Sequence, residues 1–200
     1  MKYEDSTFFD RYREYLKIPE VRAKHDQIFD IFTGVYNRRY IHAFLPNVID
    51  MGCGTGEFGR YVRDKGSFDY GNYVGVDLDV SRLDVLGAVG IADDYLKHQM
   101  GGQHEIAVSL FATEIHLSFS ERHFLYKRWF DEGIKAILVS GIQYLSSPDD
   151  KTYTEATTGI TIHQTTRTDP VALNEMRIIQ HIPSGFFVEQ YLEVWRILLP

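Results

Sequence analysis

The sequence is poor in cysteine. Cys53 is the single one among 200 residues, which excludes a disulfide within the chain. No apolar stretch approaches the roughly 20 residues that cross a bilayer as a helix, and the charged start Met1 to Asp5 lacks the apolar core of a signal peptide. The eight histidines show no spacing typical of a metal site. We therefore expect a cytoplasmic protein without a metal and without a membrane segment.

A basic surface is also lacking. Residues 46–132 carry eight basic and fourteen acidic side chains, so this stretch holds six of the seven excess negative charges. Nucleic-acid-binding proteins usually present a basic face, because phosphate contacts dominate their affinity. Apart from the pair Arg38-Arg39, no basic cluster stands out. The composition therefore disfavours a nucleic acid as partner and favours a small molecule.

Alternating helix and strand signals predict a single domain over residues 1–200. Residues 1–45 have the spacing of two helices, the second beginning at Pro19. Strands and helices alternate over residues 46–142, and residues 143–200 are rich in strand formers. The residues from Tyr153 to Asp169 fit either an inserted strand or a surface hairpin, and the sequence does not choose between them.

Two helix boundaries are predicted from capping residues. Ser81 is expected to cap a helix that runs through Leu86, and Ser118 or Ser120 to cap a helix that ends at Glu132. The second helix is expected to direct inward three apolar side chains, those of Phe124, Leu125 and Trp129.

The most informative segment is residues 48–56, VIDMGCGTG. Apolar strand formers lead into three glycines at alternate positions, which let the backbone turn sharply and approach a ligand closely. The residues that follow, 57–63, have helix-forming composition. A strand, a glycine turn and a helix in this order are typical of the start of a nucleotide-binding βαβ unit.

Two ligand classes fit this unit. Residues 54–59 form a G-x-G-x-x-G pattern, and Asp77 follows at about the spacing of the acid in dinucleotide sites. This pattern indicates an NAD(P)-dependent oxidoreductase. However, Asp50 stands directly before the glycines and would repel a pyrophosphate held at the following helix. The acid favours a ligand with a positively charged group.

From Asp50 onward, the string D-x-G-x-G-x-G resembles the first motif of the class I (Rossmann-like) S-adenosylmethionine (SAM)-dependent methyltransferases. The resemblance covers about residues 46–142. It implies a doubly wound α/β fold with a mainly parallel seven-stranded sheet, an antiparallel C-terminal hairpin and N-terminal helices that cover the site. It also implies SAM as the cofactor, with the acid near the ammonium group of the cofactor.

The same resemblance implies the other contacts to the cofactor. Asp77, at the end of the strand from Tyr73, would accept hydrogen bonds from both ribose hydroxyls, and Asp93 or Asp94 would meet the adenine. Phe111 would flank the adenine or the sulfonium, and Cys53 is a small spacer within the turn. The expected cofactor-binding residues are Asp50, Gly52, Cys53, Gly54, Gly56, Asp77, Leu78, Asp93, Asp94 and Phe111.

The segment after the strand Ile106–Phe111 gives information about the molecule that would accept the methyl group. It lacks the N-P-P-Y or D-P-P-Y string of amide- and amine-directed nucleic acid enzymes, so we expect a small-molecule acceptor. Glu114 and His116 are the polar residues best placed to act as a general base, although both could simply flank the next helix. Methyl transfer can also proceed by proximity and alignment alone. The alternatives are an RNA methyltransferase, an oxidoreductase and a non-catalytic SAM-binding partner.

Overall fold

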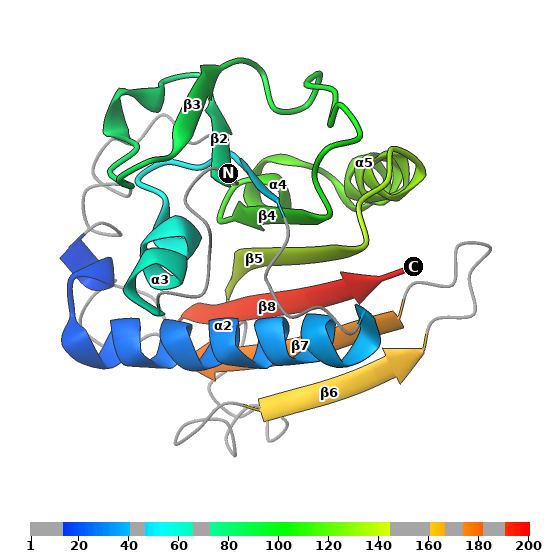
Figure 1. Cartoon of the computed structure of the whole chain (residues 1–200). Helices are drawn as coiled ribbons and strands as arrows, with labels where there is room; N and C mark the ends of the chain where they lie inside the picture. Colours follow the sequence, from blue (N-terminus) through cyan, green and yellow to red (C-terminus); the bar gives the residue numbers. More distant parts are fainter. Residues whose placement is uncertain (1–13, 41–46, 66–72, 145–160, 167–173, 182–190) are drawn as a thin grey trace.

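The computed structural model describes residues 14–40, 47–65, 73–144, 161–166, 174–181 and 191–200 (Figure 1). Most of the first helix predicted in residues 1–45 lies outside these residues. Among the described residues, no helix is both long and apolar enough to cross a membrane. The elements are α2 (Pro19–Tyr40), β1 (Val48–Met51), α3 (Glu57–Lys65), β2 (Tyr73–Asp77), the 3-10 helix η2 (Val80–Arg82), β3 (Val89–Ala92), β4 (Ile106–Leu110), α4 (Thr113–His116), α5 (Phe119–Asp131), β5 (Ala136–Tyr144), β6 (Thr161–Thr166), β7 (Asn174–His181) and β8 (Tyr191–Leu199).

One sheet joins all of these strands in the order β3-β2-β1-β4-β5-β8-β7-β6. The five strands from β3 to β5 run parallel to their neighbours, whereas β8 pairs antiparallel with both β5 and β7. The predicted fold class and its antiparallel C-terminal hairpin are therefore confirmed. The predicted count of seven strands is wrong, because the described chain has eight: β6, from the segment that the sequence left open, adds an antiparallel strand beyond β7.

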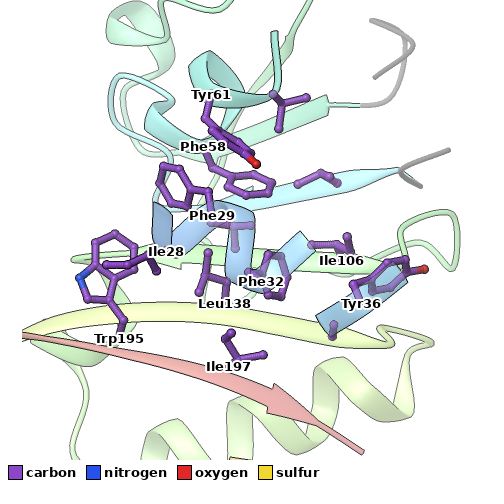
Figure 2. Close-up of a cluster of buried hydrophobic side chains, with 14 of the residues drawn as sticks. Ile28, Phe29, Phe32, Tyr36, Phe58, Tyr61, Ile106, Leu138, Trp195 and Ile197 are labelled. Atoms are coloured by element: carbon purple, nitrogen blue, oxygen red, sulfur yellow. The ribbon is translucent and has the colours of Figure 1, made fainter. Parts of the chain in front are cut away.

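The sheet is covered on both faces, as the doubly wound class requires. On one face, α2 lies over β8 and β7, and its Phe29 and Phe32 pack with Phe58 of α3 and with Leu138 of the sheet (Figures 1 and 2). On the other face, Trp129 of α5 packs against the strand residues that alternate with those of the first face and point the opposite way. The central strands are buried on both faces: β1 and β5 direct alternate residues into the two cores.

The helix boundaries test the predicted caps. α2 begins at Pro19, as predicted. α5 is capped by Ser118, whose side chain forms a capping box with Glu121. Leu125 and Trp129 are buried as predicted, but Phe124 is 72% exposed and the prediction for it is wrong. Each helical residue turns about 100°, so the face centred on Leu125 and Trp129 takes in Tyr126 on one side and leaves Phe124 outside it.

The prediction of a helix that begins at Ser81 and continues through Leu86 is also wrong. The chain forms one 3-10 turn, Val80–Arg82, and the cap is Asp79, whose side chain accepts a hydrogen bond from the Ser81 amide at 3.0 Å. An aspartate that bonds to the amide two residues later forms a local turn that competes with a regular helix.

Candidate cofactor site

A cavity of about 510 Å³ opens at the carboxyl ends of β1, β2 and β4. This is the topological switch point of the sheet, because β2 lies on one side of β1 and β4 lies on the other. Such switch points are where doubly wound sheets bind ligands, and the volume suits a small molecule. Eight of the ten predicted cofactor-binding residues line the cavity: Asp50, Gly52, Cys53, Gly54, Asp77, Leu78, Asp94 and Phe111.

The glycine turn connects β1 to α3 and forms one side of the cavity. Gly52 and Gly54 have left-handed backbone angles, with φ of 77° and 50°. A Cβ atom at position 52 would lie 2.5 Å from the Ala112 Cβ, whereas one at position 54 would meet nothing within 4 Å. Gly52 is therefore required by packing, and Gly54 leaves open space on the ligand side of the turn. Gly56 does not line the cavity but packs close to Val85.

Asp50 is the most unusual group of the site. It is 2% exposed, and its Oδ2 accepts a hydrogen bond from the Tyr73 hydroxyl of β2. Its Oδ1 has no hydrogen-bond partner among the described residues. Burial, reinforced by the charges of Asp77 and Glu57, raises the pKa of Asp50 to about 7, against the lowering effect of the Tyr73 hydrogen bond. A buried carboxylate oxygen that lacks a donor is costly, so the site suits a ligand that brings a cationic N–H group.

Asp77 ends β2 beside the glycine turn. Its Oδ2 accepts a hydrogen bond from the Gly54 amide at 2.9 Å, which links the second strand to the first loop. The amides of Gly52 and Cys53 donate to the Val76 carbonyl. Three amides of the turn are thus already engaged within the protein. This leaves the turn less able to donate hydrogen bonds to a pyrophosphate.

The two acids after β3 lie in different surroundings. Asp94 lines the cavity, and its carboxylate accepts the Leu96 amide at 3.1 Å. Asp93 is not among the lining residues; its exposed carboxylate pairs with His98 at 2.9 Å. The sequence left open which of the two acids would meet the adenine, and of the two it is Asp94 that lines the cavity.

The walls of the cavity carry an excess of acid. Among the described lining residues, Arg82 is the single side chain with a fixed positive charge, and it is 57% exposed and lies near Asp79. The lining carboxylates are those of Asp50, Glu57, Asp77 and Asp94. The field of such a cavity attracts a cation and disfavours a diphosphate. We call the side formed by Asp50, Gly54, Asp77 and Asp94 the glycine wall.

Another part of the lining is apolar and aromatic. We call it the aromatic wall and define it by Leu16, His25, Phe111 and Trp195. Phe111 follows β4 and has φ of 55°, a left-handed conformation that is strained for a phenylalanine. Its amide donates to the Ser140 carbonyl at 2.9 Å, which holds the strained turn to β5. The ring then stands edge-on to Trp195, with centroids 5.5 Å apart.

The two predicted catalytic residues occupy different places. His116 lines the cavity, and burial lowers its pKa despite the charge of Asp77. Glu114 does not line it; its carboxylate pairs with Arg122 of α5 and Arg196 of β8 and accepts a hydrogen bond from Tyr126. Glu114 therefore joins α4, α5 and β8 beneath the site.

Sequence reasoning missed the aromatic wall apart from Phe111. The position of His25 carried a signal, because it falls three and four residues before Ile28 and Phe29 on the buried face of α2. Glu193 and Trp195 carried none that distinguished them from other residues of a C-terminal strand. Trp195 reaches the cavity, and Glu193 reaches the ring of His25, because β8 pairs with β5.

Comparison with solved structures identifies the fold. The plantazolicin methyltransferase BpumL in complex with S-adenosylhomocysteine (SAH) aligns over 99% of this chain and 92% of that chain, with a TM-score of 0.53 and 12% identity. The magnesium protoporphyrin IX methyltransferase ChlM from Synechocystis PCC 6803 with bound SAH aligns over 98% and 96%, with a TM-score of 0.50 and 13% identity. No protein-family model and no curated protein sequence matches the chain. The chain therefore has the fold of the class I SAM-dependent methyltransferases, as its first motif predicted.

Proposed function

We propose that this protein is a SAM-dependent methyltransferase that acts on a small-molecule acceptor. The observation that carries the proposal is the unpartnered Oδ1 of Asp50 at the wall of an acidic cavity. SAM brings an ammonium and a sulfonium, and its electrophilic methyl group is what it supplies to the reaction. A dinucleotide would bring two phosphates to the same wall.

Each residue of the glycine wall has a place in this proposal. Asp50 accepts a hydrogen bond from the ammonium, and Gly54 lets the ligand lie against the turn. Gly52 and Cys53 shape the turn, Asp77 accepts the ribose hydroxyls, and Leu78 and Asp94 lie toward the adenine. The Asp77 carboxylate can bond to the Gly54 amide and to hydroxyls together, because its two oxygens have about four acceptor sites.

The acceptor is proposed to occupy the aromatic wall. Its members converge on the cavity from α2, β4 and β8, where Phe111 offers a partly exposed ring to a ligand and the buried Trp195 packs edge-on against that ring. The two structural neighbours are methyltransferases of different compounds, a magnesium porphyrin and plantazolicin. The acceptor must therefore be deduced from this chain's own wall, since fold alone does not select it.

Isothermal titration calorimetry tests the proposal. We expect SAM and SAH to bind with micromolar affinity and NADH and NADPH to show no binding at the same concentrations. Asp50→Asn should weaken SAM binding, because the amide can donate toward the ammonium and carries no charge. Asp93→Asn is the matched control, since Asp93 is exposed and lies outside the cavity. Binding of NADH with no binding of SAM would overturn the proposal.

The RNA alternative predicts different behaviour. An electrophoretic mobility shift with transfer RNA or capped RNA should show no complex at physiological salt, because the described cavity is acidic and phosphate contacts need positive charge. A salt-sensitive RNA complex would favour a nucleic-acid acceptor instead.

A further inference from the structure

A buried hydrogen-bonded pair, His25 and Glu193, lies at the aromatic wall, apart from the residues proposed to hold the cofactor. His25 of α2 lies with its Nε2 2.8 Å from the Oε2 of Glu193 on β8. Their side chains are 1% and 0% exposed, and 168 residues separate them in the chain. His25 nevertheless lines the cavity.

The hydrogen bonds of this pair define the role of each ring nitrogen. Glu193 Oε2 also accepts the indole N–H of Trp195 at 3.1 Å. A carboxylate at Nε2 favours the tautomer in which Nε2 carries the proton, and Nδ1 then holds a lone pair. Nδ1 has no hydrogen-bond partner among the described residues. The ring is thus oriented and polarised on one side, with a basic nitrogen left over on the other.

The surroundings of His25 are aromatic. Its ring centroid lies 4.9 Å from that of Trp195 and 6.4 Å from that of Phe111, and Tyr15 and Phe29 stand at 6.4 Å. The side chain of Glu193 is the one acid that contacts this ring among the described residues. His116, by contrast, lies where the charge of Asp77 acts on it, toward the glycine wall.

We propose that His25 is a catalytic base, held by Glu193, that deprotonates an aromatic acceptor bearing a hydroxyl group. This inference rests on the proposed methyltransferase function and adds to it the acceptor class. The hydroxyl proton passes to Nδ1 of His25 as the acceptor oxygen forms its bond to the methyl carbon. The carbon–sulfur bond breaks and its electron pair stays on sulfur, so the products are a methyl ether, neutral SAH and an imidazolium facing Glu193. The imidazolium then returns its proton to solvent.

A base at this position selects a hydroxyl over an amine. A neutral amine already presents a lone pair and can lose its proton after attack, whereas a phenol with a pKa of about 10 is a weak nucleophile until the proton leaves. The apolar rings around His25 fit an aromatic body beside that hydroxyl. Glu193 stabilises the imidazolium that forms, as the carboxylate of a catalytic triad does.

A purely structural role predicts other behaviour. The pair also joins α2 to β8, and removal of one partner from a buried pair is destabilising in either case. Stability therefore does not distinguish the two roles. Proton transfer to His25 does, because a structural pair would leave the ionisation of a bound phenol unchanged.

The test measures this proton transfer directly, without turnover. The protein is saturated with SAH, and 4-nitrophenol is added at a pH at which the free compound is largely protonated. Its yellow phenolate is followed by absorption. We expect the wild-type complex to raise the phenolate fraction severalfold over buffer. His25→Gln should abolish the increase, and Glu193→Gln should reduce it. Thr33→Val, at another buried polar position of α2, is the control expected to behave as wild type.

Turnover supplies the second measurement. With radiolabelled SAM and catechol as acceptor, we expect His25→Gln to lower kcat by about 100-fold, the usual contribution of a general base. Imidazole added to His25→Ala should restore part of the rate, which a lost structural contact would not allow. Circular dichroism and SAH titration establish that each variant is folded and binds the cofactor product.

The outcomes separate this inference from the function on which it rests. A wild-type complex that binds SAH but neither ionises 4-nitrophenol nor methylates catechol overturns the assignment of His25 and leaves the methyltransferase proposal standing. Phenolate formation that persists in folded His25→Gln overturns it as well. Failure of the wild type to bind SAM or SAH overturns the proposed function itself.

Discussion

The glycine wall and the aromatic wall line one cavity, yet they are built in different ways. Asp50, Gly54 and Asp77 belong to two adjacent parallel strands and the turns that follow them. His25 and Trp195 come from a helix before the first strand and from the last strand of the sheet. The glycine wall is therefore formed by short contiguous motifs, whereas the aromatic wall is assembled from distant segments.

Removal of the largest side chain of the aromatic wall should have the greatest effect. Trp195 is fully buried and touches the rings of His25, Phe29 and Phe111. We expect Trp195→Ala to lower the free energy of unfolding by about 3–5 kcal/mol, measured by urea denaturation. Phe124→Ala, at a side chain that is 72% exposed, should change it by less than about 0.5 kcal/mol. Equal losses would contradict the assignment of Trp195 to the core.

On the glycine wall, Asp77 should control affinity more than stability. We expect Asp77→Ala to weaken SAM binding by about 100-fold, or about 2.7 kcal/mol, which is within the range for one lost hydrogen bond to a charged group. Calorimetry gives the affinity, and Asp93→Ala, at the exposed acid after β3, should bind as the wild type does. A similar loss in both variants would show that neither acid touches the ligand.

The two cavity-lining glycines should separate packing from ligand approach. Gly52→Ala places a Cβ 2.5 Å from Ala112 and should cost about 1–3 kcal/mol of stability. Gly54→Ala meets nothing within 4 Å, so its cost should be confined to the left-handed backbone, about 1 kcal/mol. Thermal unfolding measures both effects. Gly54→Ala should lose SAM affinity in addition, because the added methyl group faces the ligand.

The smallest effect concerns pH. The pKa of Asp50 is raised to about 7 mainly by burial, so the uncharged carboxyl favours the folded protein, and this contribution is lost as pH rises through about 7. A bound ammonium needs the carboxylate, and SAM affinity should therefore fall several-fold, at most about tenfold, from pH 7.5 to pH 6.

Calorimetry in buffers of different ionisation enthalpy should detect the proton that Asp50 releases on binding. Burial lowers the pKa of His116 below its ordinary value, so His116 takes up its proton at a lower pH than Asp50 does. In Asp50→Asn the pH dependence should flatten; an unchanged slope would assign the titration to another group.

The predictions from sequence succeeded where neighbours in the chain are neighbours in space. The glycine turn, the acid at the end of β2 and the cap at Ser118 each depend on contacts within a few residues or between adjacent parallel strands. They failed where a local alternative was close in energy, as at Ser81, or where the rotation of about 100° between neighbouring helical residues decided burial, as at Phe124. The bounds 1–45 and 46–142 for the helical segment and the cofactor-binding core stay predictions.

The sequence by itself was enough to specify a strand, an acid, a glycine turn and a helix in this order. The conformational freedom of glycine and the spacing of apolar residues both act over a few neighbouring positions. The partnership of His25 with Glu193 was decided by the folded sheet. The antiparallel pairing of β8 with β5 brings Glu193 opposite Ile142 and under α2. No interaction along the chain links residues 168 positions apart; burial of two apolar faces brings them together, and the hydrogen bond follows.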